Sequence, residues 1–305
     1  MRFTAMQTVI ERLKPQFVEI IIYAVLILLL MTGTYWRNKA WNTAFDLWSD
    51  CMKKSPNKDR PHNNLGNIFL SQGKSQEAIH QYSEALRINP NYAEAHNNLG
   101  NVFLNQGKSQ EAAHQFNEAL RINPNYAEAH YNLGNVFLNQ GKSQEAIHQY
   151  GEALRINPNL AEVHSNLGFV FLNQGKSQEA VTQYNEALRI NPNDAEAHYN
   201  LGNIFLNQGK SQEAIHQYRE ALGINPNLAE AHNNLGNVFL NQGKYQEAAH
   251  QYREVLRINS SDAEAHYNLG NAYLMIGNRG LAVKEYQILK TMNPSLANIL
   301  YQKLK

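Results

Sequence analysis

Apolar residues along most of the chain recur three or four positions apart, the spacing of one face of an α-helix. In residues 127–160, Ala129 and Leu133 lie on one such stripe, and Tyr150 and Ala153 lie on a second. No stretch alternates between apolar and polar residues as a half-buried strand does. The pattern therefore predicts an all-α protein with two helices in this segment.

Turn-forming residues separate the two predicted helices. Gly141 lies where a helix favours a left-handed C-terminal residue, and Ser143 follows as the predicted N-cap of the second helix. Pro158 cannot continue a helix, and Asn159 with Glu162 approximates a capping box for the next one. The segment thus predicts two antiparallel helices joined by a short turn.

This helix pair recurs at a constant interval along the chain. The interval is marked by Gly66, Gly100, Gly134, Gly168, Gly202, Gly236 and Gly270. Seven repeats of equal length follow, at 59–92, 93–126, 127–160, 161–194, 195–228, 229–262 and 263–296. Because one helix pair cannot bury its apolar face alone, neighbouring repeats must stack to form the core. We therefore predict a helical solenoid over 59–296, although the length of 305 residues alone would suggest two domains.

The repeat resembles the tetratricopeptide repeat. The residues that match the family pattern are His130, Leu133, Gly134, Phe137, Ala146, Tyr150, Ala153 and Pro158 and their copies, with histidine where the family has tryptophan. The resemblance implies a right-handed superhelix of helix-turn-helix repeats. It also implies a protein that binds other proteins and catalyses no reaction.

Composition excludes several other chemistries. Lys+Arg 27 against Asp+Glu 26 gives a formal charge of +1, which argues against nucleic-acid binding. One cysteine, Cys51, excludes an internal disulfide framework and a thiolate zinc cluster. The 12 histidines fall at two repeat positions, so they spread along the solenoid instead of converging on a metal. We expect no metal site and no cofactor.

A tripeptide typical of phosphate loops recurs but has the wrong spacing. Gly73-Lys74-Ser75 and its copies contain the GKS of that loop, which needs four residues between its first glycine and the GK. Six residues separate Gly66 from Gly73, and a helix precedes them. We interpret the tripeptide as a helix-to-helix turn, and with no Ser/His/Asp arrangement in the sequence we expect no catalytic residues and no enzyme.

Residues 1–58 follow another pattern. Residues 1–16 form a basic N-terminal segment, and residues 20–31 are apolar without interruption. Residues 17–36 are long enough to cross a bilayer, and the three tryptophans follow at its far end, where interfacial anchors lie. A cleaved signal peptide and a buried helix are the alternatives. We predict a single-pass membrane helix at 17–36 that anchors the chain in the lipid bilayer.

Partial repeats flank the seven full ones. Ala44, Trp48 and Pro56 stand one repeat length before their counterparts in the first full repeat, so 37–58 resembles a second helix without its first. The end of the chain resembles a degenerate first helix. We predict that 37–58 is a capping half repeat and that 297–305 is a C-terminal cap.

The junction after the apolar segment carries a second resemblance. Tyr35-Trp36-Arg37-Asn38-Lys39-Ala40-Trp41, Leu47-Trp48 and Lys53–Asn57 are similar to the link between the last membrane helix and the repeats in the transmembrane-and-tetratricopeptide protein family. This family includes membrane glycosyltransferases, and the resemblance implies repeats outside the cytoplasm. The catalytic membrane part is absent from this sequence. An alternative function is therefore the non-catalytic, substrate-recruiting part of a membrane glycosyltransferase system, similar to O-GlcNAc or O-mannosyl transferases.

Asparagine recurs at two positions of the predicted first helices. The first row is Asn64, Asn98, Asn132, Asn166, Asn200, Asn234 and Asn268; the second row is Asn67, Asn101, Asn135, Asn203, Asn237 and Asn271, interrupted by Phe169. An amide offers a donor and an acceptor, which matches an extended peptide backbone. The first row is similar to the asparagine ladder of the protein O-GlcNAc transferase repeats, which implies peptide binding on the concave face. The alternative is that these side chains cap or pack locally.

The charges around the rows narrow the expected ligand. Glutamates such as Glu94 and Glu128 flank the first row, and the adjoining Asn97 and Tyr131 are not basic. A carboxylate clamp for a chain terminus needs lysine or arginine there. The sequence therefore predicts a membrane-anchored scaffold that binds extended, neutral or mildly basic segments of partner proteins. The sequence does not identify the ligand. Charge does not give the membrane orientation either, since basic residues stand on both sides of the predicted span.

Overall fold

The computed structural model describes residues 19–20, 22–35, 41 and 43–305. All regular structure within these residues is α-helical, which confirms the all-α prediction for the described part of the chain. The chain divides into two compact units, Met1–Val136 and Phe137–Lys305, and each is described by itself.

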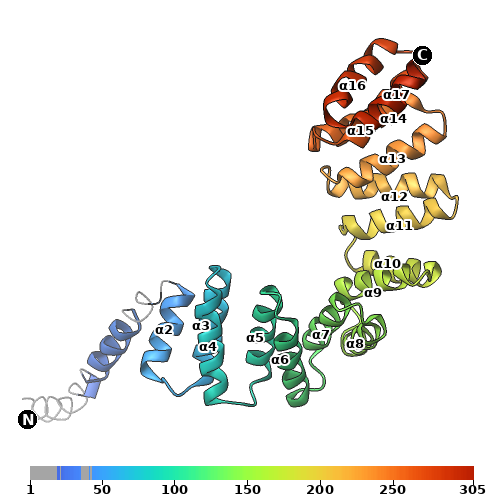
Figure 1. The fold of residues 1–305 in the computed structure, drawn as a ribbon. Helices are drawn as coiled ribbons and strands as arrows, with labels where there is room; N and C mark the ends of the chain where they lie inside the picture. Colours follow the sequence, from blue (N-terminus) through green and yellow to red (C-terminus); the bar gives the residue numbers. More distant parts are fainter. Residues whose placement is uncertain (1–18, 21, 36–40, 42) are drawn as a thin grey trace, which may run out of the picture. The chain divides into compact units, whose positions relative to one another are not determined.

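A helical segment at 22–35 precedes the labelled helices of Figure 1. Their bounds are α2 Ala44–Lys54, α3 Asp59–Ser71, α4 Ser75–Ile88, α5 Ala93–Asn105, α6 Ser109–Ile122, α7 Ala127–Asn139, α8 Ser143–Ile156, α9 Ala161–Asn173, α10 Ser177–Ile190, α11 Ala195–Asn207, α12 Ser211–Ile224, α13 Ala229–Asn241, α14 Tyr245–Ile258, α15 Ala263–Ile276, α16 Arg279–Met292 and α17 Pro294–Leu304.

In the first unit, α3 packs along α4 and α5 along α6, and each pair is joined by a short turn as in an αα-hairpin. The helix α2 lies against α3, where the rings of Phe45 and Phe69 meet edge to face with their centroids 5.8 Å apart. Residues 44–54 therefore cover the first helix of the first full repeat.

In the second unit, the pairs α9–α10, α11–α12, α13–α14 and α15–α16 follow one another, and α17 packs on both α15 and α16. Leu300 and Leu304 of α17 are buried in one cluster with Ala282 and Leu289 of α16. The helix α17 begins at Pro294, before the predicted boundary at 297, because the Asn293 side chain accepts a hydrogen bond from the Leu296 backbone N–H at 3.2 Å and caps it.

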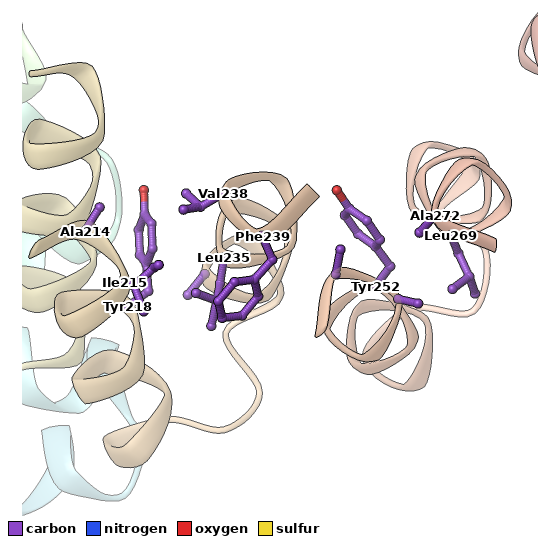
Figure 2. Close-up of a cluster of buried hydrophobic side chains, with 12 residues drawn as sticks. Ala214, Ile215, Tyr218, Leu235, Val238, Phe239, Tyr252, Leu269 and Ala272 are labelled. Carbon is purple, nitrogen blue, oxygen red and sulfur yellow. The ribbon is translucent and has the colours of Figure 1, made fainter. Parts of the chain in front are cut away.

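The predicted apolar stripes form the core between neighbouring helices. In Figure 2, side chains from α12, α13, α14 and α15 make one buried cluster, which includes Tyr218, Leu235, Tyr252 and Leu269. Tyr218 and Tyr252 are fully buried. The spacing of three and four residues therefore places the side chains of the predicted apolar stripes in the core between the helices, as a 3.6-residue period requires.

The helix-to-helix turn is confirmed. Gly141 adopts φ 72°, and the glycines at the same position of the other repeats have φ between 72° and 85°. This left-handed conformation ends the first helix at no steric cost to glycine. The predicted N-cap two positions after this glycine is wrong, because Ser143 is the first residue of α8 and Lys142 is its N-cap, without a side-chain hydrogen bond.

The predicted capping box at Asn159 is also wrong. The N-cap of α9 is Leu160, which makes no side-chain hydrogen bond. The Oδ1 of Asn157 instead accepts a hydrogen bond from the backbone N–H of Asn159 at 3.1 Å. An Asx-turn of this kind, formed around Pro158, reverses the chain before the helix begins.

Among the described residues, no helix has both the length and the hydropathy needed to cross a membrane. The span predicted at 17–36 includes residues 17, 18, 21 and 36, which lie outside the described residues, so it stays a prediction. The basic segment 1–16 lies outside them too, as do 37–40 and 42 of the predicted half repeat.

Candidate functional site

The two asparagine rows lie on the first helices of the repeats, from α3 to α15. The first-row side chains are half-buried, except that Asn132 is buried. The second-row side chains are half-buried as well, except that Asn67 is exposed. Since the rows are three residues apart on each helix, they share one helical face. The structure therefore keeps the predicted residues together on each helix and shields most of them partly from water.

Several of these asparagines connect one repeat with the next. In the first unit, Asn98 Nδ2 donates hydrogen bonds to Asn63 Oδ1 at 3.1 Å and to Asn67 Oδ1 at 3.0 Å. The hydroxyl of Tyr82 also donates to Asn67 Oδ1, at 2.7 Å. The Asn67 oxygen thus accepts one bond from its own repeat and one from the following repeat, and we call this arrangement the tyrosine–asparagine bridge.

The same bridge recurs in the second unit. Tyr218 donates to Asn203 Oδ1 at 2.7 Å, and Asn234 Nδ2 donates to the same oxygen at 2.9 Å. The local-packing interpretation therefore holds for Asn98, Asn203 and Asn234, whose hydrogen bonds are made within the protein.

The remaining side chains of the rows differ in whether their amides make hydrogen bonds with the protein. No described side chain makes a hydrogen bond with the half-buried amides of Asn64, Asn200 and Asn268. Asn237 accepts from Tyr252 at 2.7 Å, and Asn271 accepts from Lys303 Nζ at 2.8 Å. The rows are therefore mixed: some amides hold repeats together, and others can bond to a ligand.

A further pair of asparagines, which the sequence pattern did not single out, also connects neighbouring repeats. Asn63 and Asn97 are fully buried. Their Nδ2 atoms donate to Glu94 Oε1 at 2.9 Å and to Glu128 Oε1 at 3.0 Å, in the next repeat. Glu94 and Glu128, which flank the first row, therefore accept hydrogen bonds from within the protein. The available signal was an asparagine doublet followed by a glutamate near the start of the next repeat.

Repeat 161–194 departs from this scheme and contains a cavity. A cavity of about 230 Å³ lies mainly between α9, α10 and α11, and Leu138 of α7 also lines it. Its polar and aromatic lining includes Ser165, Asn166, Phe169, Tyr184, Glu196 and Asn200. Phe169 occupies the second-row position and offers no acceptor there, and the residue is 42% exposed. Tyr184 is 1% exposed, and its hydroxyl oxygen has no hydrogen-bond partner among the described residues.

The protonation of that hydroxyl follows from its surroundings. Burial raises the pKa of Tyr184 above its ordinary value, and the negative charges of Glu196 and Asp194 raise it further. Tyr184 therefore remains a hydrogen-bond donor throughout the physiological range of pH.

The histidines on the first helices of the repeats have structural roles. His198 Nδ1 lies 2.7 Å from Gln217 Oε1 on α12, and its Nε2 lies 3.4 Å from the carbonyl oxygen of Pro192. The equivalent His266 contacts Glu285 Oε2 at 2.6 Å. Each ring thus fastens the loop before the first helix to the second helix. Within the described part of the chain, no group of three or more His, Cys, Asp or Glu is placed to hold a metal ion.

Comparison with known sequences identifies a related family. The family model described as "Cilia and flagella-associated protein 70 C-terminal domain" matches residues 52–269. No curated protein matches the chain. The matching family is neither the transmembrane-and-tetratricopeptide protein family nor that of the protein O-GlcNAc transferase. The resemblances to these two therefore stay expectations.

Solved structures establish the fold. The PilF protein of Pseudomonas aeruginosa is 24% identical with a TM-score of 0.60, over 70% of this chain and 97% of that one. A tetratricopeptide repeat protein from Parabacteroides merdae is 18% identical with a TM-score of 0.56, over 81% and 98%. YrrB, also a tetratricopeptide repeat protein, is 24% identical with a TM-score of 0.51, over 60% and 95%. The repeats are therefore of the tetratricopeptide type.

Proposed function

The chain belongs to the tetratricopeptide-repeat family described as the cilia and flagella-associated protein 70 C-terminal domain, and from this premise we propose that it is a non-catalytic scaffold for extended peptide segments of partner proteins. The observation that carries the proposal is the set of open amides at Asn64, Asn200 and Asn268. Each is a half-buried donor and acceptor on a first helix. Such groups match the alternating carbonyl and N–H groups of an extended backbone.

A solved structure of the same fold supports a peptide ligand. YrrB is described as a tetratricopeptide repeat protein with an unusual peptide-binding site. Because its likeness to this chain establishes the fold alone, the peptide ligand is part of our proposal. The proposal depends on the open amides of this chain.

The non-catalytic part of the proposal is supported by the GKS tripeptides. Gly73 has φ 74° in the turn after α3, and Lys74 is the N-cap of α4. The Lys74 ammonium lies 5.8 Å from the centre of the Phe69 ring, a cation–π contact within the turn. The lysine therefore packs on the protein instead of reaching for a phosphate.

An alanine double variant tests peptide binding. We expect Asn200→Ala with Asn268→Ala to weaken binding of the full chain to an array of extended, end-capped peptides by roughly 30-fold, since two lost hydrogen bonds are worth about 2 kcal/mol. Asn207→Ala with Asn241→Ala is the matched control, because these exposed asparagines end the same type of helix outside the rows. Equal affinity of both double variants and the unchanged chain would refute the proposal.

We also propose that residues 17–36 anchor the scaffold in a membrane as a single-pass helix. In the described part of this segment the large apolar side chains are exposed, and Leu30 is 70% exposed. Exposed apolar surface of this extent needs an apolar environment. Extraction of isolated membranes with alkaline carbonate should leave the full chain in the pellet. Release into the supernatant would contradict the anchor.

The side of the membrane is a separate proposal. The resemblance at the junction favours repeats outside the cytoplasm, in which case protease added to intact cells should cut the chain at loops such as Asn259–Asp262. Complete protection until lysis would place the repeats in the cytoplasm and remove the glycosyltransferase-recruiting alternative. Copurification of a polytopic membrane glycosyltransferase in mild detergent would instead favour that alternative.

A further inference from the structure

One substitution in the second asparagine row removes an acceptor that two donors share in other repeats. In the second unit, Asn203 Oδ1 accepts hydrogen bonds from Tyr218 and from Asn234. The residues equivalent to these three, one repeat earlier, are Phe169, Tyr184 and Asn200. Because phenylalanine has no acceptor, neither the Tyr184 hydroxyl nor the Asn200 amide makes a hydrogen bond with a described side chain.

A second substitution leaves a carboxylate open beside these donors. Asn63 and Asn97 hold the glutamates of the following repeats, Glu94 and Glu128. The equivalent position is Ser165, whose hydroxyl donates to Asp194 Oδ2 at 2.8 Å instead. Asp194 is otherwise occupied as the N-cap of α11, where it accepts from two backbone N–H groups at 3.0 and 3.1 Å.

Because Ser165 bonds to Asp194, the Glu196 carboxylate lacks the hydrogen bond that Glu94 and Glu128 receive. No described side chain donates a hydrogen bond to it, and it lines the same cavity. Two donors, one anion and one exposed aromatic ring therefore surround a single space. A buried hydroxyl without a partner costs stability, and a ligand that supplies an acceptor would recover that cost.

From this arrangement we infer that the cavity between α9, α10 and α11 is a specificity pocket for an arginine side chain of the bound peptide. This inference rests on the proposed peptide-binding function and names the residue that the peptide must carry. The guanidinium stacks on the Phe169 ring and donates to the Glu196 carboxylate. The Tyr184 hydroxyl and the Asn200 amide donate to a peptide carbonyl beside it.

The size of the cavity fits this ligand. An apolar cavity of about 150 Å³ holds a benzene molecule, and the cavity here is about 230 Å³. Arginine suits the site better than lysine, because its planar group can stack on a ring and bond to a carboxylate simultaneously.

Capped peptides with a single variable residue test the pocket. The probe is an end-capped extended peptide of alanine and serine with arginine, lysine or glutamine at its centre, and fluorescence anisotropy measures its affinity for the full chain. We expect the arginine peptide to bind at least tenfold more tightly than the glutamine peptide, a difference of about 1.4 kcal/mol.

Two variants test whether the preference for arginine arises in this pocket. Phe169→Asn restores the second-row asparagine, giving Tyr184 and Asn200 their usual acceptor, and should abolish the preference while the helical circular dichroism is unchanged. Glu196→Gln should reduce the preference at least tenfold. Glu230→Gln, at the equivalent exposed position one repeat later, is the control and should preserve it.

The outcomes separate the pocket from the proposed function. Binding of all three peptides without an arginine preference overturns the pocket alone. An arginine preference that survives Phe169→Asn also overturns it. Binding of none of the peptides, together with no binding on the peptide array, overturns the proposed function and the pocket that rests on it.

Discussion

Tyr184 and Tyr218 occupy the same position on the second helices α10 and α12, and both are buried. Of the two, only Tyr218 has a hydrogen-bond partner within the part of the chain that the structure describes. Its hydroxyl donates to Asn203, whereas that of Tyr184 faces a phenylalanine position. A hydrogen bond contributes about 1 kcal/mol net, and an unpartnered buried polar atom costs a similar amount. Identical residues in equivalent repeats therefore have opposite energetic roles, decided by the side chain at one neighbouring position.

Removing the two hydroxyls should show this difference directly. We expect Tyr218→Phe to lower the free energy of unfolding by about 1 kcal/mol, and Tyr184→Phe to leave it unchanged or raise it. Urea titrations of the full chain followed by circular dichroism would measure both. Equal destabilisation by the two variants would mean that Tyr184 has a partner.

In the helix pairs α3–α4, α5–α6, α9–α10, α11–α12 and α13–α14, a glycine of the first helix sets the distance to the second helix. A Cβ at Gly202 of α11 would lie 2.6 Å from Cε1 of Tyr218 on α12, and at Gly100 the nearest atom would be Phe116 Cε1 at 2.7 Å. No real Cβ contact is that short, so the helices could not keep their spacing. The glycine therefore faces the aromatic ring of the second helix, which fills the space that a side chain would need.

Two glycine-to-alanine changes within one repeat should have opposite signs. Gly202→Ala should destabilise the chain by about 1–3 kcal/mol, because it overpacks the contact with Tyr218. Gly223→Ala is the matched change: Gly223 lies in α12, is exposed and has no non-neighbouring atom within 4 Å of a built Cβ. It should stabilise α12 by about 0.5–1 kcal/mol through helix propensity. Thermal unfolding of the two variants gives the comparison, and destabilisation by Gly223→Ala would argue against this account.

Along the chain as a whole, the described contacts are mostly between neighbouring helices, which is typical of stacked repeats. In the second unit α13 packs on α12 and α14, and α15 packs on α14 and α16. The tyrosine–asparagine bridges and the asparagine–glutamate bonds reach only from one repeat to the next. Stability should then be close to a sum over repeats and their interfaces.

Deletion of one complete repeat tests this additivity. A chain lacking 229–262 joins Leu228 to Ala263, and its new neighbours carry the same stripe residues, since Leu235 and Leu269 are equivalent. It should fold with a similar helical signal per residue and a lower unfolding midpoint. Deletion of 229–244 alone, which removes α13 and leaves α14 without its partner, should destabilise the chain far more. Loss of folding on deletion of 229–262 would contradict a nearest-neighbour solenoid.

The order of residues along the chain was enough to predict the repeat length, the helical type of every described element and part of the core, including Leu133 and Tyr150. These features depend on local periodicity, and Gly141 with φ 72° shows how one residue can specify a turn. The failed predictions were local as well: Ser143 lies inside α8, and the N-cap of α9 is Leu160 instead of Asn159. Residue type alone does not decide at which of several neighbouring residues a helix begins.

The roles of the asparagines, in contrast, emerged only from the stacking of the repeats. Asn98 bonds to Asn67 and Asn63, which belong to the preceding repeat, so these bonds cannot be read from either segment alone. The same stacking turns a single substitution, Phe169, into an unpartnered tyrosine, an open amide and a cavity. A hydrogen bond depends on the position and direction of both groups, and a sequence pattern fixes neither for residues on different repeats.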